Sequence, residues 1–180
     1  MRSSVNPTVL IVIDLQRGVL AECFDAEGVV SRTAALVDRA RDERVPIIWV
    51  QDEHDFPQDS EGWGLAEGLT RALGEPLVRK SYRDAFADTG LDELLEGFDV
   101  THIVVAGAQS DYCIRTTTQA AAVRGYDVTL VGDAHTTTDA EWDGEQLTAQ
   151  QIIAHTNRYF SGLRYPDQTF AVVPAADVAF

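Results

Sequence analysis

Short apolar runs, rich in β-branched residues, recur along the chain and constrain its fold more than any other feature. They occupy residues 8–13, 45–50, 103–105, 128–131 and 170–173. Nearly continuous apolarity is typical of strands that are buried on both faces of a parallel sheet. We therefore predict that these five runs are strands of one parallel sheet.

Helical patterns separate the predicted strands. Residues 29–40 place their apolar side chains on one side of a helix, and residues 91–98 keep the i, i+3, i+4, i+7 spacing. Strands that alternate with helices form right-handed βαβ units. The predicted fold class is therefore α/β, a three-layer α/β/α sandwich with a mostly parallel, doubly wound sheet. The length of 180 residues predicts a single domain, residues 1–180.

Two helix starts carry capping signals. Thr89 with Asp92, and Thr148 with Gln151, resemble capping boxes and predict helix starts near residues 90 and 149. Between the second and third of the five runs, residues 52–71 are rich in Asp, Glu, Gly and Pro. We interpret this segment as a long loop over the functional site, with an irregular surface excursion as the alternative.

The charge balance excludes some partners. The chain has 14 basic and 29 acidic residues, for a net charge of −15 at pH 7. This field repels polyphosphates, so we expect no nucleic-acid binding; it either keeps the surface soluble or attracts a cationic ligand. The apolar run at residues 9–13 is too short for a membrane span or for the core of a signal peptide. We therefore expect a cytoplasmic protein that does not bind membranes.

Three residues at predicted strand ends are candidates for chemistry, because ligands of open parallel sheets bind beyond the carboxyl ends of the strands. Asp14 ends the run VLIVID, Lys80 ends the short extended segment LVRK, and Cys113 follows the run HIVVAG. Each also has a plainer interpretation, as a turn-capping aspartate, a solvated lysine or a buried structural cysteine.

Cys113 has the sequence setting of a reactive thiol. It forms no C-x-x-C pair with Cys23, so we expect neither a disulfide framework nor a zinc site. Helix-compatible residues begin near Ser110, which we predict to be the N-cap, and this places Cys113 in the first turn. There the unpaired backbone N–H groups and the helix dipole lower the pKa of a thiol and can hold an oxyanion. Lys80 would stabilise the thiolate further.

Longer motifs around these residues resemble a known family. They are VLIVIDLQRG, KSYRDAFADTGLDELL, VVAGAQSDYCIRTTTQAAAVRGYDVTLVGDAHTT and LTAQQIIAHTNRYF. Together they resemble the isochorismatase-like superfamily of cysteine hydrolases, which includes nicotinamidases, N-carbamoylsarcosine amidohydrolase and ureide hydrolases. The loop EHDFPQDSEGWGL and the turn DAHTT are similar to the branch that contains streptothricin hydrolase, which opens a lactam in a cationic antibiotic.

The resemblance implies a catalytic triad of Asp14, Lys80 and Cys113. It also implies a cis peptide bond between Ala108 and Gln109, which would turn the N–H groups of Gln109 and Cys113 into an oxyanion hole. Asp14 would take the thiol proton while Lys80 stabilises the charges, and the sulfur would attack an amide carbonyl to form a thioester that water hydrolyses. The expected function is cleavage of an amide-type C–N bond in a small molecule.

The sequence departs from nicotinamidases at their metal site. Asp52 and His54 form the Asp-x-His pair of that site, but the loop contains no further histidine. Two protein ligands hold a metal weakly, so we expect no metal and no cofactor. His54 then either hydrogen-bonds within the loop or contacts the substrate.

Aromatic and apolar residues near the triad are candidates for the pocket, although such residues are also ordinary packing residues. Val19 and Tyr112 would flank the triad, and Trp63, Tyr82 and Phe86 would form walls. The presence of Cys113 favours acyl chemistry over the enol-ether cleavage of isochorismatase.

Several alternatives stay open. The chain is an amide or lactam hydrolase, or else a nicotinamidase, a ureide hydrolase or an isochorismatase; a different class is an inactive oligomeric binding scaffold. A dinucleotide-binding domain is disfavoured, because no G-x-G-x-x-G follows a predicted strand. The resemblance implies a homodimer or a homotetramer.

Overall fold

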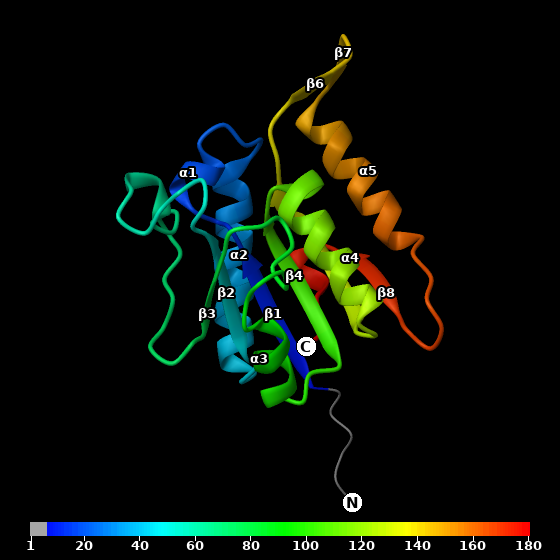
Figure 1. The fold of residues 1–180 in the computed structure, drawn as a ribbon. Helices are drawn as coiled ribbons and strands as arrows, with labels where there is room; N and C mark the ends of the chain where they lie inside the picture. The colour runs from blue at the N-terminus through cyan, green and yellow to red at the C-terminus, as the bar shows by residue number, and fades with distance from the viewer. Residues whose placement is uncertain (1–6) are drawn as a thin grey trace, which may run out of the picture.

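A six-stranded parallel sheet with helices on both faces forms the centre of the protein (Figure 1). The computed structural model describes residues 7–180, so residues 1–6 of the predicted domain lie outside the described residues. The strand order is β3-β2-β1-β4-β5-β8, and every adjacent pair is parallel. The predicted α/β class, with a doubly wound sheet between two helical layers, is confirmed, whereas the single-domain organisation stays a prediction.

The elements follow the alternation of the sequence. The strands of the sheet are β1 (Thr8–Ile13), β2 (Ile47–Asp52), β3 (Leu77–Lys80), β4 (His102–Ala108), β5 (Asp127–Thr136) and β8 (Phe170–Val173). The α-helices are α1 (Arg17–Leu20), α2 (Ala26–Asp42), α3 (Leu91–Gly97), α4 (Arg115–Val123) and α5 (Ala149–Ser161). Short helical turns are η1 (Glu61–Trp63), η2 (Ser110–Ile114) and η3 (Ala175–Asp177). Within residues 7–180, no helix is long and apolar enough to cross a membrane.

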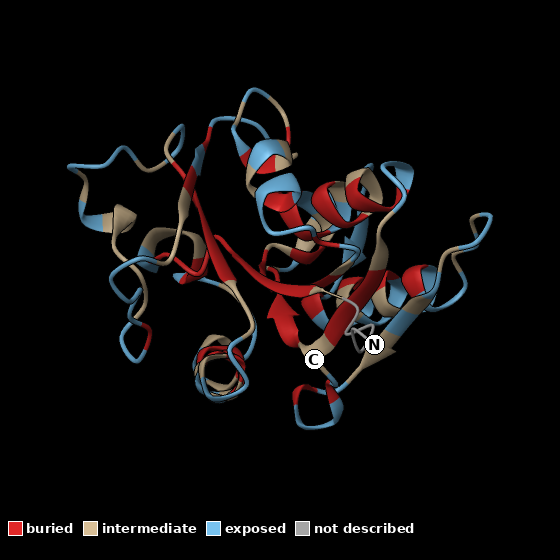
Figure 2. Cartoon of the chain, turned by 90° about the horizontal axis from the view of Figure 1, so that it is seen from below, coloured by how far each residue is buried: buried red, intermediate tan, exposed pale blue. Residues whose placement is uncertain are grey.

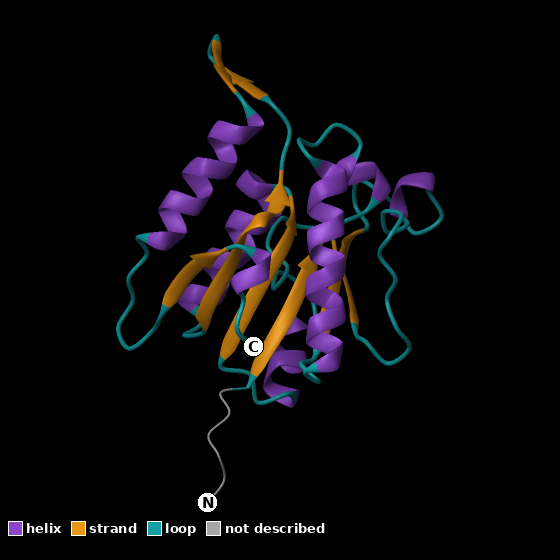
Figure 3. Cartoon of the chain, turned by 180° about the vertical axis from the view of Figure 1, so that it is seen from behind, coloured by secondary structure: helices purple, strands orange, loops and turns teal. Residues whose placement is uncertain are grey.

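The apolar runs are buried because helices pack on both faces of the sheet. All six residues of β1 are buried, and successive side chains of a strand point to opposite faces. Ile11 belongs to the core cluster that includes α3, α4 and α5, and Leu10 belongs to the cluster that includes α2. Figure 2 shows the buried strands between the helices, and Figure 3 shows α2 crossing the opposite face from the view of Figure 1.

The strand bounds differ in part from the predicted ones. All five predicted runs form strands, but β2 begins at Ile47, and β4 and β5 extend beyond residues 103–105 and 128–131. β3, the extended segment that ends in Lys80, is the sixth strand, at the sheet edge. A projecting antiparallel hairpin of β6 (Ala140–Trp142) and β7 (Glu145–Leu147) has no apolar run to predict it (Figure 1).

One of the two predicted capping boxes is confirmed. The Thr148 hydroxyl accepts from the Gln151 backbone N–H at 3.2 Å, and the Gln151 side chain accepts from the Thr148 N–H at 2.9 Å. The predicted helix start near residue 90 is confirmed, because α3 begins at Leu91, but the capping box at Thr89 is wrong, because Gly90 occupies the N-cap position. The Thr89 hydroxyl donates instead to the Ala85 carbonyl, and the Asp92 carboxylate pairs with Arg124 at 2.9 Å.

Candidate active site

Four polar side chains meet at the carboxyl edge of the sheet. Asp14 directly follows β1, Asp52 and Lys80 end β2 and β3, and Cys113 lies in η2, just after β4. The parallel register places Asp52 opposite Lys80. Gly107 lets β4 approach β1 closely, because a Cβ at this position would lie 2.0 Å from the Ile13 carbonyl oxygen. The topology therefore gathers residues that are far apart in sequence.

The Lys80 ammonium lies at the centre of this group. Its Nζ atom is 2.8 Å from Asp14 Oδ2, 3.3 Å from Cys113 Sγ and 3.4 Å from Asp52 Oδ2. Lys80 and Asp14 are each 1 % exposed, and Cys113 is 3 % exposed. The three residues predicted as a triad are thus in direct contact, away from bulk water.

Burial controls the charges of these groups. Burial raises the pKa of Asp14 to about 6, although the neighbouring Lys80 ammonium opposes this rise. Burial lowers the pKa of Lys80, but Asp14, Cys113 and Asp52 together hold it above its ordinary value. At neutral pH we therefore describe the pair as an ionised carboxylate beside an ammonium ion.

The expected lowering of the Cys113 pKa is wrong. Burial raises the pKa of this thiol to about 12, and the Asp14 carboxylate adds to the rise, while Lys80 opposes it. Desolvation of the thiolate thus outweighs the helix terminus and the ammonium ion. The resting thiol is protonated beside an ionised Asp14, whose Oδ1 atom is buried and has no hydrogen-bond partner within the described residues.

The turn that carries Cys113 differs from the predicted helix start. Residues Ser110–Ile114 form a π-helical turn that leads into α4, and Gln109, not Ser110, occupies the N-cap position. Ser110 does not cap the turn, because its hydroxyl lies 2.7 Å from His135 Nδ1. The peptide bond between Ala108 and Gln109 is cis, at the position that the resemblance implies.

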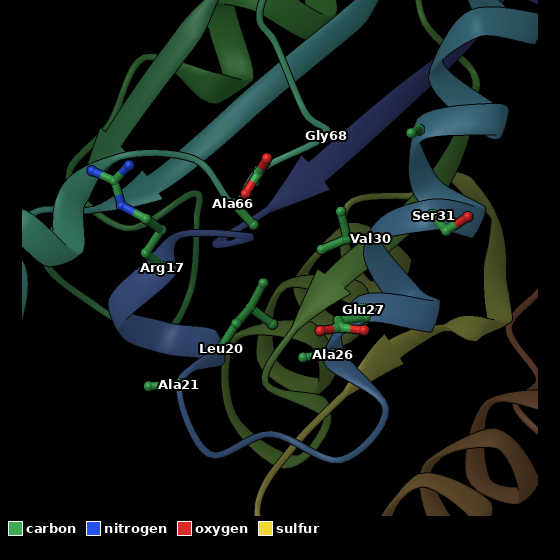
Figure 4. Close-up of a pocket in the computed structure, with 11 residues that line it drawn as sticks. Arg17, Leu20, Ala21, Ala26, Glu27, Val30, Ser31, Ala66 and Gly68 are labelled. Carbon is green, nitrogen blue, oxygen red and sulfur yellow. The ribbon is translucent and has the colours of Figure 1, made fainter.

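A cavity of about 260 Å³ opens onto these groups. Its lining residues come from four segments that follow strands, and they are Asp14, Gly18, Val19, Asp52, Asp55, Phe56, Arg83, Gln109 and Cys113. A larger hollow of about 660 Å³ lies between α1, α2 and residues 66–68 (Figure 4). None of Asp14, Lys80 and Cys113 lines that hollow, so the smaller cavity is the candidate active site.

Of the predicted pocket residues, Val19 lines the cavity and five do not. His54 is exposed and Trp63 is half-buried in η1. Tyr82 is exposed, and Tyr112 is exposed beneath the Arg83 guanidinium, which lies 4.8 Å from its ring centre. Phe86 is buried in the core, under Arg124.

Asp55, Phe56 and Arg83 line the cavity and are not predicted from the sequence. Phe56 packs on Gly18, where an added Cβ would lie 2.2 Å from the Phe56 ring. Arg83 lies 3.7 Å from Asp55 across the cavity lining. The position of Arg83 three residues after Lys80 is the only sequence signal for these residues. Of residues 52–71, Asp52, Asp55 and Phe56 line the cavity, whereas residues 66–68 line the larger hollow, so the interpretation of the whole segment as a loop over the site holds only for its first part.

The residues around Asp52 do not fit a metal ion. Asp52 Oδ1 accepts a hydrogen bond from the Asp55 backbone N–H at 2.8 Å, and Oδ2 faces the Lys80 ammonium. His54 is exposed and does not line the cavity, whereas Asp52 does. Among residues 7–180, no group of three or more His, Cys, Asp or Glu side chains is arranged to hold a metal.

Comparison with known proteins identifies the family. The isochorismatase domain matches residues 8–156. Two streptothricin hydrolases of Streptomyces noursei are 35% and 36% identical over 146 and 138 residues, which are 76% and 72% of this chain. These matches span 58% and 50% of the relatives, so the chain corresponds to about half of their length.

A solved structure supports the same assignment. The crystal structure of an isochorismatase from Pseudomonas putida KT2440 is similar to this chain with a TM-score of 0.87 and 28% sequence identity. The superposition covers 98% of this chain and 92% of that one. The chain belongs to the isochorismatase family of hydrolases.

Proposed function

We propose that this protein hydrolyses an amide-type C–N bond of a small molecule, with Cys113 as the nucleophile. One observation carries the proposal: the Lys80 ammonium bridges the Asp14 carboxylate and the Cys113 sulfur, at 2.8 and 3.3 Å, beside a cavity. A nucleophile, a base and a cation held together in this way can attack the carbonyl carbon of an amide without a cofactor.

The pKa values suggest how the proton moves. With pKa values of about 6 for Asp14 and about 12 for Cys113, the resting thiol does not give its proton to the carboxylate. We infer that the proton passes to Asp14 as the sulfur attacks the carbonyl carbon, so that negative charge develops on the carbonyl oxygen. In the proposed mechanism, the N–H groups of Gln109 and Cys113 bind that oxyanion.

The second half of the reaction reverses the role of Asp14. Protonated Asp14 gives its proton to the nitrogen as the C–N bond breaks, which releases an amine and leaves a thioester on Cys113. Asp14 then takes a proton from water, and the hydroxide attacks the thioester. The carboxylic acid product then leaves, and the Cys113 sulfur takes back the proton that Asp14 held. Lys80 stays charged throughout and offsets the negative charge of the carboxylate or the sulfur.

The cavity favours a small acyl group. Its volume of about 260 Å³ is at the lower end of ligand pockets, which hold a few hundred Å³ or more. Asp55 and Arg83 give its lining both signs of charge. We propose an amide or a lactam as the substrate, and the similarity to streptothricin hydrolases supports the lactam of a cationic compound. Nicotinamidase, ureide hydrolase and isochorismatase activities are the alternatives.

A screen of small amides tests this proposal. Nicotinamide, ureides, lactams and cationic amides are incubated with the protein, and release of ammonia or of a new amine is followed by mass spectrometry. We expect at least one to be cleaved, and Cys113→Ala to abolish the cleavage while Cys23→Ala retains it. Absence of cleavage in the whole panel would favour the alternative of an inactive oligomeric scaffold, and full activity of Cys113→Ala would exclude Cys113 as the nucleophile. Measurement of the mass in solution tests the predicted homodimer or homotetramer.

A further inference from the structure

A series of buried hydrogen bonds connects the turn that carries Cys113 to helix α5. His135, on β5, is 2 % exposed, and its Nδ1 atom lies 2.7 Å from the Ser110 hydroxyl. Its Nε2 atom lies 2.8 Å from Asn157 Oδ1, on α5. The Asn157 amide nitrogen donates to the Gly132 carbonyl at 2.9 Å. The series therefore links α5, β5 and the first residue of η2.

The partners of Asn157 determine which nitrogen of His135 carries a proton. Because the amide nitrogen of Asn157 faces a carbonyl, its oxygen faces His135 and must accept a hydrogen bond from Nε2–H. The Nδ1 atom is then unprotonated and accepts from the Ser110 hydroxyl. One neutral form of the His135 ring thus satisfies every polar group in this series of hydrogen bonds. The Ser110 hydroxyl then has one orientation, in which it donates to Nδ1.

The position of Ser110 makes this series relevant to the reaction. Ser110 lies between Gln109 and Cys113, whose N–H groups form the proposed oxyanion hole. A second bond holds the same turn, since the Thr137 hydroxyl donates to Asp111 Oδ1 at 2.6 Å. Residues 135 and 137 therefore fasten two successive residues of the turn. Small displacements of groups that bind a transition state reduce rates strongly.

We propose that His135 is a positioning residue, which holds the backbone N–H groups of the Cys113 turn at the oxyanion through its hydrogen bond with Ser110. This inference rests on the proposed function. His135 itself does not line the cavity, so its proposed effect on the reacting atoms is indirect. Its effect should therefore appear in the rate of the acyl transfer and not in substrate binding.

Two substitutions of His135 separate its two hydrogen bonds. Asparagine carries its amide oxygen two bonds beyond Cβ, as Nδ1 is in histidine, so His135→Asn keeps an acceptor for Ser110. Glutamine places its amide at the position of Nε2, so His135→Gln keeps the contact with Asn157 and loses the bond to Ser110. Ser110→Ala removes the same bond from the other side. His102→Gln is the control, because His102 bonds Thr8 and Thr129 at the opposite end of β4.

Hydrolysis of p-nitrophenyl acetate provides an assay that does not depend on the natural substrate. We expect His135→Gln and Ser110→Ala to lower kcat by about 10- to 100-fold with KM little changed. The double variant should be no slower than either single variant, because both remove one interaction. His135→Asn should stay within about 3-fold of the wild type, as should His102→Gln.

The outcomes distinguish this inference from the proposed function. If His135→Gln and Ser110→Ala keep the wild-type kcat, or if His135→Asn falls as far as His135→Gln, the positioning role is refuted while the cysteine mechanism stands. If Cys113→Ala hydrolyses the ester as fast as the wild type, the proposed function fails, and this inference fails with it. Thermal unfolding is measured for each variant, and Ser110→Ala, which loses a single hydroxyl, decides the outcome if His135→Gln does not fold.

Discussion

Substitution of Lys80 by methionine should move the pH dependence of the reaction. The Lys80 ammonium lies 2.8 Å from Asp14 Oδ2, and both side chains are buried. At an effective dielectric constant of about 20, two unit charges at this distance attract each other by about 6 kcal/mol. This attraction opposes the effect of burial, which has already raised the pKa of Asp14 to about 6. Methionine fills similar space and removes the charge.

The loss of this attraction should leave Asp14 protonated at neutral pH. Even half of the interaction, about 3 kcal/mol, changes the equilibrium between the ionised and protonated carboxyl by more than about 100-fold. In the wild type, kcat/KM should rise with pH through about 6, as Asp14 loses its proton and becomes a base, and then level off. In Lys80→Met, the rise should shift to alkaline pH, and kcat/KM at pH 7 should fall at least about 10-fold.

The assay is kcat/KM for a cleaved amide, measured as a function of pH. Arg79→Met is the matched control, because Arg79 precedes Lys80 on β3 but is half-exposed, 3.8 Å from Glu53. It should keep both the rate and the pH profile of the wild type. A Lys80→Met variant that is slow at every pH, with its rise still near pH 6, would show that Lys80 does not control the ionisation of Asp14.

Three further outcomes are expected. Excess EDTA should leave the turnover unchanged, because both oxygens of Asp52 are already engaged; a loss that zinc, iron or manganese restores would contradict this. Iodoacetamide should modify neither Cys113 nor Cys23 faster than an ordinary peptide thiol, because burial raises both pKa values; rapid alkylation of Cys113 in peptide mapping would instead support the thiolate expected from its sequence position. An amide that bears an amine should be cleaved in preference to its carboxylate analogue, because the net charge is −15. Salt should weaken this preference, and equal kcat/KM values at low salt would exclude charge selection.

The sequence predicted the parts of the site that lie at strand ends. Buried parallel strands are nearly continuous apolar runs, so the sequence shows that β1 ends just before Asp14. The predicted turn from strand to helix places Cys113 at the same edge of the sheet. Lys80 was found because the short segment before it has strand character. Each of these signals is local in sequence. The parallel topology brings the three residues together, because it places the carboxyl ends of the strands at one edge of the sheet.

The rest of the site depends on contacts that no local pattern reveals. Asp55 and Phe56 reach the cavity because the loop folds back over α1, where Phe56 packs on Gly18. The sequence predicts a lowered pKa for Cys113 because it shows the position of this residue in a helix turn but not its burial or its contact with Asp14, which raise the pKa. His135 becomes informative only when α5 brings Asn157 to its ring.

The central claim is that Cys113 forms a thioester with the acyl part of the substrate. Rapid quenching in acid during turnover of a cleaved amide, followed by mass spectrometry of the intact protein and of its peptides, tests it most directly. We predict a protein whose mass has increased by the acyl group, with the addition mapped to Cys113 and absent from Cys113→Ala. A protein that turns over the amide without any adduct, together with a Cys113→Ala variant that still cleaves it, would contradict the account.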